Sequence, residues 1–335
     1  MRPPVFWGNP PGAPGLAVRL LAPFSLIWRA ADGHRWQHGG HTDPGVPVIC
    51  VGNINLGGTG KTPTVIWFVE HLGALGRTPH IVSRGYGGRE TGPLRIRPDM
   101  AADAVGDEPL LLCAFAPTWV AKNRLLGVQA ARAAGADVVV LDDGMQNPSV
   151  RKNFTVMVVD AGQGFGNGYL FPAGPLRQSV PEGLARADAV VIIGTGAEQR
   201  HLLAAWPALT LSDIFAARVK PLHTGMDWSD MRVFAFAGIG RPGKFFDTLR
   251  AAGATVAVER AFADHQPLSD KLMTRMAREA NRVNAQLVTT EKDAARLPAR
   301  WRRKVLPLSV RLEVAGKDRL IGLLQAALGH NPEDT

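Results

Sequence analysis

Short apolar runs alternate with helical patterns along most of the chain. A run of consecutive apolar residues between polar turns predicts a buried strand, and apolar residues that recur every three or four positions predict a helix. Strands that alternate with helices are typical of an α/β protein with mostly parallel strands. In the first part of the chain, strands are predicted at residues 46–51, 81–82, 137–143, 154–160 and 189–193, and helices at 65–72 and 124–134.

The composition changes near residues 207–230, and a second series of the same kind follows. Residues 210–221 and 304–314 each alternate between polar and apolar positions, so they are predicted to pair as a two-stranded connector. A chain of 335 residues is long for one core, and two domains are therefore expected. The second series has predicted strands at residues 233–237, 255–258 and 286–289 and a predicted helix at 269–284.

A glycine-rich turn separates the first predicted strand from the first predicted helix. It ends in Gly60, Lys61 and Thr62, which is the pattern of a phosphate-binding loop. Glycines let backbone amides close around phosphate oxygens, the lysine reaches the β- and γ-phosphates, and the threonine hydroxyl ligates Mg²⁺. The usual pattern has a glycine where this chain has Asn55, and asparagine tolerates left-handed backbone better than most residues. The predicted nucleotide-binding residues are Asn55, Leu56, Gly57, Gly58, Thr59, Gly60, Lys61 and Thr62.

Acidic residues stand at two further places where phosphate chemistry needs them. Asp142 and Asp143 end a predicted strand, and Mg²⁺ beside a phosphate-binding loop is held by carboxylates at a neighbouring strand end. Asp107 and Glu108 lie in a Gly-Asp-Glu-Pro loop before a helix, where acids also serve as ordinary helix caps.

A histidine and three arginines complete the set of candidates. His265 follows Asp264 in the second series, and histidine is the side chain best suited to move a proton near neutral pH. It takes that role only if the second domain closes over the first. Arg84, Arg124 and Arg177 lie in or beside segments rich in glycine or proline, where arginine binds phosphate in bidentate fashion. Each arginine taken singly is equally explained as a solvated charge.

Residues 238–243 match the G-x-G-x-x-G pattern of dinucleotide-binding proteins. They follow a predicted strand, and Glu259 lies where a ribose-binding acid belongs, so a dehydrogenase is an alternative. Against it, Arg241 and Pro242 crowd the start of the helix, and the chain already has a nucleotide site. The preferred interpretation is a tight turn from strand to helix.

The net charge of the chain indicates which kinds of partner are expected. A formal charge of +9 and a pI near 10.1 favour nucleic acid, anionic lipid or a phosphorylated substrate. No basic run or nucleic-acid-binding motif occurs, so nucleic acid is not expected. The two cysteines, Cys50 and Cys113, lie far apart in apolar contexts, which predicts reduced thiols in a cytosolic protein.

Residues 16–28 are strongly apolar but too short to span a bilayer, and they contain Arg19 and Pro23. No cleavage site of a signal peptide follows them. A helix lying in the membrane interface and a helix packed on the protein core both fit this segment. The residues that share one side of the helix are Leu16, Leu20, Phe24, Ile27 and Trp28.

Motifs that span residues 50–295 follow one another in the order known from one family. They lie at residues 51–53, 57–63, 83–87, 105–109, 141–146, 165–168, 172–177, 234–240, 262–265 and 290–293. On these residues the chain resembles the tetraacyldisaccharide 4′-kinase family, the lipid A 4′-kinases of Gram-negative envelopes. Asn55 fits this family, whose loop is rich in glycine mainly on the lysine side. Asn147 stands where the family is expected to have histidine.

The resemblance implies two α/β/α sandwich domains, the first a P-loop NTPase-like, mostly parallel sheet, joined by a two-stranded β connector. It implies that residues 1–40 are a membrane-interface helix region, 41–215 the P-loop kinase domain, and 216–335 a smaller domain that closes the cleft. The last predicted helix, 320–328, is expected to pack back on the first domain. The implied reaction passes the γ-phosphate of ATP to the 4′-hydroxyl of a tetraacyl glucosamine disaccharide 1-phosphate.

The resemblance also implies roles. Lys61 and the loop amides hold the phosphates, and Mg²⁺ is held by Thr62, Glu108 and Asp142. Asp107 accepts the proton of the 4′-hydroxyl, with His265 hydrogen-bonded to it. The residues expected at the substrate or the phosphates are Asp143, Gln146, Arg84, Arg124 and Arg177.

The expected setting is a peripheral monomer on the cytoplasmic face of the inner membrane, with a lipid A precursor as partner. A P-loop GTPase or metallochaperone that switches shape is the rival from another class. It predicts a guanine-reading Asn-Lys-x-Asp motif, to which residues 290–293 bear only a loose likeness. A membrane-binding module without activity leaves Lys61, Asp142 and Asp143 without a role.

Overall fold

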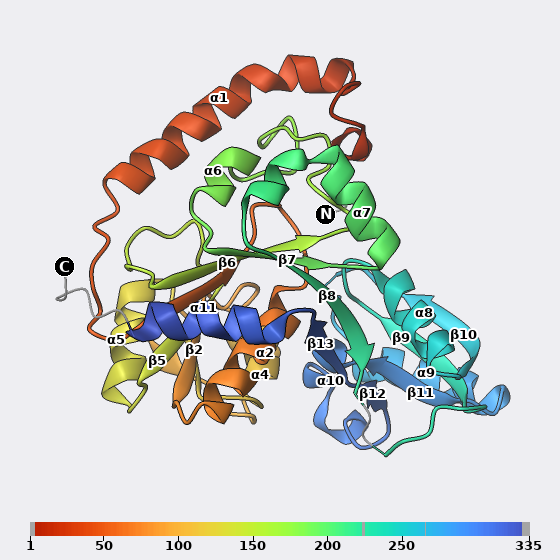
Figure 1. Ribbon diagram of the computed structural model, residues 1–335. Helices are drawn as coiled ribbons and strands as arrows, with labels where there is room; N and C mark the ends of the chain where they lie inside the picture. The colour runs from red at the N-terminus through yellow and green to blue at the C-terminus, as the bar shows by residue number, and fades with distance from the viewer. Residues whose placement is uncertain (1–3, 223–224, 265, 330–335) are drawn as a thin grey trace.

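The computed structural model describes residues 4–222, 225–264 and 266–329 (Figure 1). These residues form two β-sheets, each with helices on both faces. The larger sheet consists of β1 (Val48–Gly52), β2 (Pro79–Ser83), β3 (Leu94–Arg95), β4 (Thr118–Val120), β5 (Val138–Asp142), β6 (Phe154–Asp160), β7 (Ala189–Ile193), β8 (Ile214–Pro221) and β13 (Val310–Val314). The smaller sheet consists of β9 (Arg232–Ala237), β10 (Thr255–Ala261), β11 (Gln286–Thr290) and β12 (Leu306–Leu308).

The strand order of the larger sheet brings the carboxyl ends of β1, β5 and β6 side by side. Within the described residues the larger sheet has the order β13-β8-β7-β6-β1-β5-β2-β4-β3, and the smaller has β10-β9-β11-β12. Strand β1 pairs in parallel with both β5 and β6, and Val51 lies beside Asp142. The carboxyl ends of these three strands therefore meet at one edge, where ligands of α/β proteins bind. The predicted α/β class with mostly parallel strands is confirmed.

Helices cover both faces of the larger sheet. Helices α2 (Lys61–Ala74) and α11 (Lys317–Gly329) pack on one face, and α5 (Arg124–Ala133), α6 (Val180–Leu184) and α7 (Gly196–Ala205) pack on the other. The apolar stripe predicted for α2 is buried against the sheet, with Val65, Phe68 and Leu72 fully inaccessible. Leu320 and Leu324 of α11 join the same core. The remaining short helices of this part are η1 (Val5–Gly8), α3 (Ala102–Val105), α4 (Asp107–Leu112) and η2 (Pro207–Leu211).

The smaller sheet is covered in the same way. Alternate side chains of β9 point to opposite faces. Ala235 packs toward α8 (Pro242–Ala251), whereas Phe234 and Phe236 pack toward α9 (Asp270–Arg282). The helices α10 (Glu291–Ala295) and η3 (Ala299–Trp301) follow β11. The two α/β/α sandwiches predicted from the resemblance are thus present.

The predicted two-stranded connector is confirmed, with shorter strands than expected. Strand β8 pairs antiparallel with β13, from Val310 beside Pro221 to Val314 beside Ala217. Residues 304–314 were expected to form one strand, but they divide at Ser309. Strand β12 joins the smaller sheet beside β11, and β13 joins the edge of the larger sheet. The chain changes sheets there, so a single strand is impossible.

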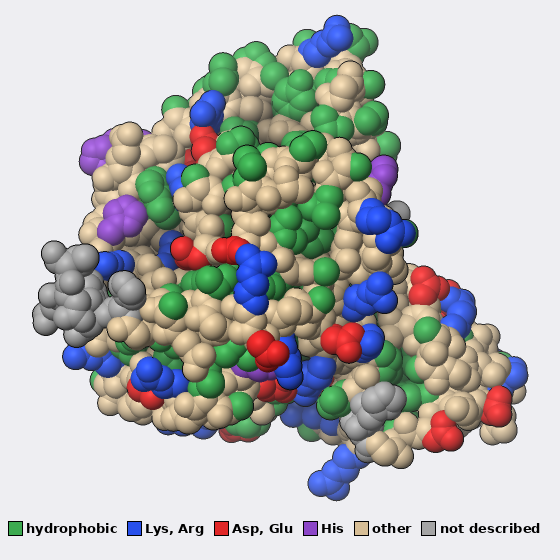
Figure 2. Space-filling view, in the orientation of Figure 1, with side chains coloured by type: hydrophobic (Ala, Val, Ile, Leu, Met, Phe, Trp, Pro, Cys, Tyr) green, Lys and Arg blue, Asp and Glu red, His purple; other side chains and the backbone are tan. Residues whose placement is uncertain are grey.

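Helix α1 (Leu16–Gln37) lies across the molecule above α6 (Figure 1). One side of it faces the protein, where the Ser25 hydroxyl donates to the Leu170 carbonyl at 2.8 Å. The helical spacing predicts Trp28 on the same side as Phe24 and Ile27, but its indole N–H donates to the Arg177 carbonyl and its ring packs on Phe171. Hydrophobic side chains remain at the surface over this helix (Figure 2). Those more than half exposed are Leu16, Leu20, Phe24, Leu26 and Ile27.

Candidate active site

The glycine-rich turn leaves the carboxyl end of β1 and enters α2 at Lys61. Gly57 and Gly60 have φ of 132° and 92°, a region that favours glycine. Asn53 organises the turn from within, because its side-chain amide donates to the Gly57 carbonyl at 3.2 Å and to the Thr59 hydroxyl at 3.0 Å. Asn53 was missed as a site residue, although it lies in a motif that carried the resemblance.

Asn55 does not adopt the left-handed backbone that asparagine tolerates and that the usual glycine here predicts, since its φ is not positive. Its buried side chain instead donates to the Gly164 carbonyl at 2.9 Å. The amide of Leu56 donates to the Pro175 carbonyl at 2.7 Å, and Asn55 forms a β-bridge with Leu176. Residues 164–177 therefore support the loop from one side. A glycine at position 55 would lack the side-chain hydrogen bond to Gly164 and would be held less firmly.

Lys61 begins α2 and faces the acidic end of β5. Its ammonium lies 3.4 Å from the Asn53 side-chain oxygen and 3.6 Å from the Asp143 carboxylate. Thr62, the predicted magnesium ligand, follows in the first turn of α2 and is partly exposed. The loop thus presents a cation and a hydroxyl at the start of a helix, where the helix field also favours anions.

The two acids at the end of β5 have different environments. Asp142 is 3% exposed; one carboxylate oxygen accepts from the Ser83 hydroxyl at 2.9 Å, and the other has no partner among the described residues. Burial, and then the charges of Glu108 and Asp143, raise the pKa of Asp142 to about 7. Burial also acts on Asp143, but the charges of Lys61 and Arg177 outweigh it and lower the pKa of Asp143.

Of the three predicted arginines, Arg177 contacts an acid directly, Arg124 interacts with the acids only through their charge, and Arg84 does neither. Arg177 donates to the Asp143 carboxylate and to the Gln146 side-chain oxygen, each at 3.2 Å, and Gln146 donates to the Asn53 carbonyl at 2.7 Å. Arg124 is buried and donates to the Ala121 carbonyl. Burial lowers the pKa of Arg124, and the charges of Asp142 and Asp143 oppose that shift. Arg84 is exposed.

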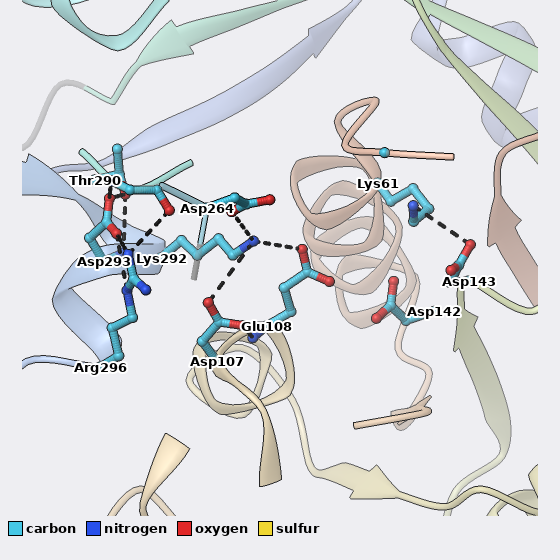
Figure 3. A network of polar contacts seen from close by, with 12 residues as sticks. Lys61, Asp107, Glu108, Asp142, Asp143, Asp264, Thr290, Lys292, Asp293 and Arg296 are labelled. Carbon is cyan, nitrogen blue, oxygen red and sulfur yellow. Dashed lines mark hydrogen bonds and ion pairs between the residues drawn. The ribbon is translucent and has the colours of Figure 1, made fainter. Parts of the chain in front are cut away.

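Asp107 and Glu108 begin α4, and they meet a residue of the other sheet. The ammonium of Lys292, on α10, lies 3.1 Å from the Glu108 carboxylate, 4.0 Å from that of Asp107 and 3.7 Å from that of Asp264 (Figure 3). Burial lowers the pKa of Lys292, but these three carboxylates outweigh burial and raise it. Lys292 was missed as a site residue, although it too lies in a motif that carried the resemblance. His265 lies outside the described residues.

The G-x-G-x-x-G segment is occupied by side chains of the protein itself. The Gly238 amide donates to Asp293 and its carbonyl accepts from Arg296, and Arg296 also pairs with Asp293. Glu259, the candidate ribose ligand, pairs with Arg250. The segment therefore acts as a strand-to-helix turn, as preferred from the sequence.

The same contacts bear on the rival nucleotide switch. A guanine-reading motif presents its aspartate to the base, whereas Asp293 is fully buried and holds Gly238, Thr290 and Arg296. Residues 290–293 thus serve to hold α10 against the smaller sheet.

The fold and the loop define a P-loop nucleotide-binding protein with a second α/β unit against its site. The sequence model of the tetraacyldisaccharide-1-P 4′-kinase family matches residues 17–329. A tetraacyldisaccharide 4′-kinase of Dinoroseobacter shibae is 52% identical over 326 residues, covering 97% of each chain, and one of Jannaschia sp. is 47% identical over 330 residues, covering 98% of this chain and all of the other. The chain belongs to the tetraacyldisaccharide-1-P 4′-kinase family.

A solved structure has the same fold. The crystal structure of LpxK from Aquifex aeolicus in complex with ATP superposes with a TM-score of 0.74 and 23% identity, covering 93% of this chain and 100% of that one. The fold class predicted from the sequence is confirmed by this likeness.

Proposed function

We propose that this protein transfers the γ-phosphate of ATP to the 4′-hydroxyl of a tetraacyl disaccharide 1-phosphate, a step of lipid A biosynthesis. The observation that carries the proposal is Lys61 at the start of α2, with its ammonium 3.6 Å from Asp143 and the Asp142–Asp143 pair at the adjoining strand end. The structure of LpxK from Aquifex aeolicus is a complex with ATP, and the curated relatives are named tetraacyldisaccharide 4′-kinases. Phosphoryl transfer depends mostly on positioning and on neutralising charge, which these residues are equipped to do.

The chemistry that Mg²⁺ would supply, when bound, is positive charge that offsets the charge developing on the phosphate oxygens. The residues that would hold it are Thr62, Glu108 and Asp142. Among the described residues no group of three or more His, Cys, Asp or Glu side chains is arranged to hold an ion alone. Magnesium bound with a nucleotide needs only one or two carboxylates. One buried carboxylate oxygen of Asp142 has no hydrogen-bond donor among the residues that the structure describes, and it fits this role because a buried acceptor without a donor is costly.

Asp107 is proposed as the base that accepts the proton of the 4′-hydroxyl, with His265 as its hydrogen-bonding partner. Asp107 is 5% exposed and lies beside Glu108, so a base at this position would stand next to a magnesium ligand. The burial of the Asp107 side chain supports its proposed role as a base, because a base must stay within one hydrogen bond of the proton that it accepts. Replacement of Asp107 by Asn is expected to lower kcat by about 10²- to 10⁴-fold, which leaves a measurable residual rate, and to leave ATP binding in place.

The remaining predicted residues are proposed to contact the substrate or its phosphates. Arg177, Gln146 and Asp143 form one hydrogen-bonded group next to Lys61. Arg124 has one guanidinium nitrogen, Nε, that is buried and without a partner among the described residues. Such a donor fits a phosphate oxygen that arrives with a ligand. Arg84, exposed in the loop after β2, is proposed to contact the outer part of the substrate.

The row of exposed apolar side chains on α1 is proposed to lie in the cytoplasmic face of the inner membrane, where the acyl chains of the substrate are found. No described helix combines the length and the apolar character needed to cross a bilayer. An amphipathic helix that buries such a row in the headgroup region gains binding energy in proportion to the apolar area, and the net charge of +9 adds attraction to anionic lipid. We further propose a monomer that does not bind nucleic acid.

One assay tests the proposed function. The protein is incubated with γ-labelled ATP, Mg²⁺ and the tetraacyl disaccharide 1-phosphate in mixed micelles, and label is sought in the lipid. Transfer to the lipid that requires Lys61 is the expected result. Release of free phosphate without an acceptor, or a preference for GTP, contradicts it and favours a nucleotide switch. For α1, sedimentation with anionic vesicles should fall in a Phe24→Ser, Ile27→Ser variant.

A further inference from the structure

Lys292 lies on the side of the smaller sheet, and its side chain extends to the candidate active site at the larger sheet. It belongs to α10, which follows β11, whereas its carboxylate partners Asp107 and Glu108 begin α4. In Figure 3 the Lys292 side chain extends from α10 toward both carboxylates, and Lys61 and Asp142 are seen beyond Glu108. We propose that Lys292 is a positioning residue for phosphoryl transfer, which fixes the Asp107 and Glu108 carboxylates from the opposite domain. This inference rests on the proposed function.

The base of the Lys292 side chain is held rigidly. The Thr290 hydroxyl donates to the Asp293 carboxylate at 2.7 Å, and that carboxylate accepts from the Gly238 amide at 3.0 Å. Arg296 donates to Asp293 and to the Gly238 carbonyl. These four hydrogen bonds fix the backbone from which the Lys292 side chain extends. Precise positioning by a locked supporting residue is what an active site needs.

The electrostatic setting is also specific. The Lys292 side chain is 18% exposed and stands among three carboxylates, whereas Lys61 pairs with a different acid, Asp143. Without Lys292, the Glu108 carboxylate loses its ammonium donor at 3.1 Å, and the repulsion between the Asp107 and Glu108 carboxylates loses the cation that offsets it. The Glu108 side chain would then occupy several rotamers, and the geometry of the site would loosen.

Simple attachment of the two sheets does not require Lys292, because other ion pairs provide it. Arg241 and Lys244 pair with Asp160 at 2.7 and 2.9 Å, and Arg311 of β13 pairs with Glu291 of α10 at 3.4 Å. Glu291 precedes Lys292 directly and also bridges the sheets, yet its contacts within the described part of the chain do not involve Asp107 or Glu108. It therefore offers a matched control for the effect of weakening this interface.

The test compares Lys292→Met, Lys292→Arg and Glu291→Gln in the lipid kinase assay, with thermal melting to establish that each is folded. For Lys292→Met we expect kcat to fall by about 10- to 100-fold, the range seen when supporting residues of a site are removed, with KM for ATP and lipid changed by less than about threefold. Lys292→Arg should recover most of the lost kcat, and Glu291→Gln should remain within about twofold of the wild type.

A double-mutant cycle shows whether Lys292 acts through the two acids. In a background of Asp107→Asn and Glu108→Gln, a positioning residue has nothing left to position, so adding Lys292→Met should cost less than about twofold more. An additive loss in that background overturns the inference, as does an unchanged kcat in Lys292→Met or an equal loss in Glu291→Gln. Failure of the wild type to label the lipid contradicts the proposed function instead, so the two failures are distinguishable.

Discussion

The indole N–H of Trp28 donates a hydrogen bond of 2.9 Å to the carbonyl of Arg177. The amide of the same arginine donates to the Ile54 carbonyl at 2.7 Å, and its guanidinium reaches Asp143 at 3.2 Å. One residue therefore contacts the exposed N-terminal helix, the nucleotide loop and the acid beside Lys61. A helix with an exposed apolar side is thus joined to the glycine-rich loop by a short series of hydrogen bonds.

Removing the first of these hydrogen bonds should loosen the loop. Trp28→Phe keeps an aromatic ring against Phe171 but deletes the indole donor. A neutral hydrogen bond contributes about 1 kcal/mol, so kcat for the lipid should fall by about fivefold. Hydrogen exchange should quicken both in α1 and in residues 54–56, whereas the midpoint of global thermal unfolding changes little.

Trp7→Phe is the matched control for that variant. The Trp7 indole donates a similar bond of 3.1 Å to the Pro172 carbonyl, but it does not contact Arg177. Its loss should quicken exchange near residues 4–9 and leave kcat unchanged. Unaltered exchange at residues 54–56 in Trp28→Phe shows that α1 and the loop are not coupled.

Lys61→Met should remove most of the transferase activity. The ammonium is the cation of the loop, held 3.4 Å from Asn53 and 3.6 Å from Asp143. Loss of one preorganised charge at a phosphoryl group costs about 10²- to 10³-fold in kcat. Lys220→Met, which breaks an exposed ion pair with Glu313, should retain wild-type kcat. Lipid labelling at the wild-type rate by the Lys61 variant is incompatible with a phosphate-binding loop at this place.

Ser83→Ala should weaken the use of magnesium without touching a proposed ligand directly. The Ser83 hydroxyl fixes one oxygen of Asp142 at 2.9 Å, and the other oxygen is the one left for the metal. Loss of such an outer contact typically costs about 10- to 100-fold in metal affinity. A titration of kinase activity with Mg²⁺ should show the half-saturating concentration rising by at least about tenfold.

Ser149→Ala provides the comparison, since that hydroxyl bonds Asn147 and no carboxylate. Its Mg²⁺ titration should overlay that of the wild type. Equal curves for Ser83→Ala and the wild type remove Asp142 from the proposed metal site.

Local patterns predicted much of the fold because burial imposes them directly. Strands β6 and β7 coincide with the predicted ranges, since both are runs of apolar residues between polar turns. Strand β4 and helices α6 and α7 were not predicted. Two of them are five residues long or shorter, and α7 has one fully buried leucine rather than an apolar stripe. The domain bounds of 1–40, 41–215 and 216–335 remain a prediction.

The residues of the candidate site also fall into those that local patterns predict and those that they do not. The loop and Asp142–Asp143 were found because each is a contiguous motif whose chemistry follows from residue types. Asn53 and Lys292 were missed because their importance lies in partners that are distant in sequence: Lys292 meets Glu108, which lies 184 positions earlier. Spacing along a chain carries no information on such contacts, and the roles assigned to the site residues remain predictions.

The pH dependence of stability should reveal the buried His80. Burial, and then the charge of Arg95, lower the pKa of His80 below its ordinary value of 6.5. Trp119 donates to its ring at 3.3 Å, which requires an unprotonated nitrogen. The unfolded chain therefore binds more protons than the folded chain below pH 6.5. Stability should fall as the pH drops from 6.5 toward the lowered pKa, and it should be fully retained above pH 6.5.

His80→Asn removes the titrating group while its side-chain oxygen still accepts from Trp119. Between pH 7.5 and 5.5, the thermal midpoint of the wild type should therefore fall more than that of the variant. His201→Asn, a change at an exposed position on α7, should follow the wild-type curve. Wild-type and His80→Asn curves that run parallel across this range contradict the assignment, because a buried neutral histidine must contribute a slope that asparagine lacks.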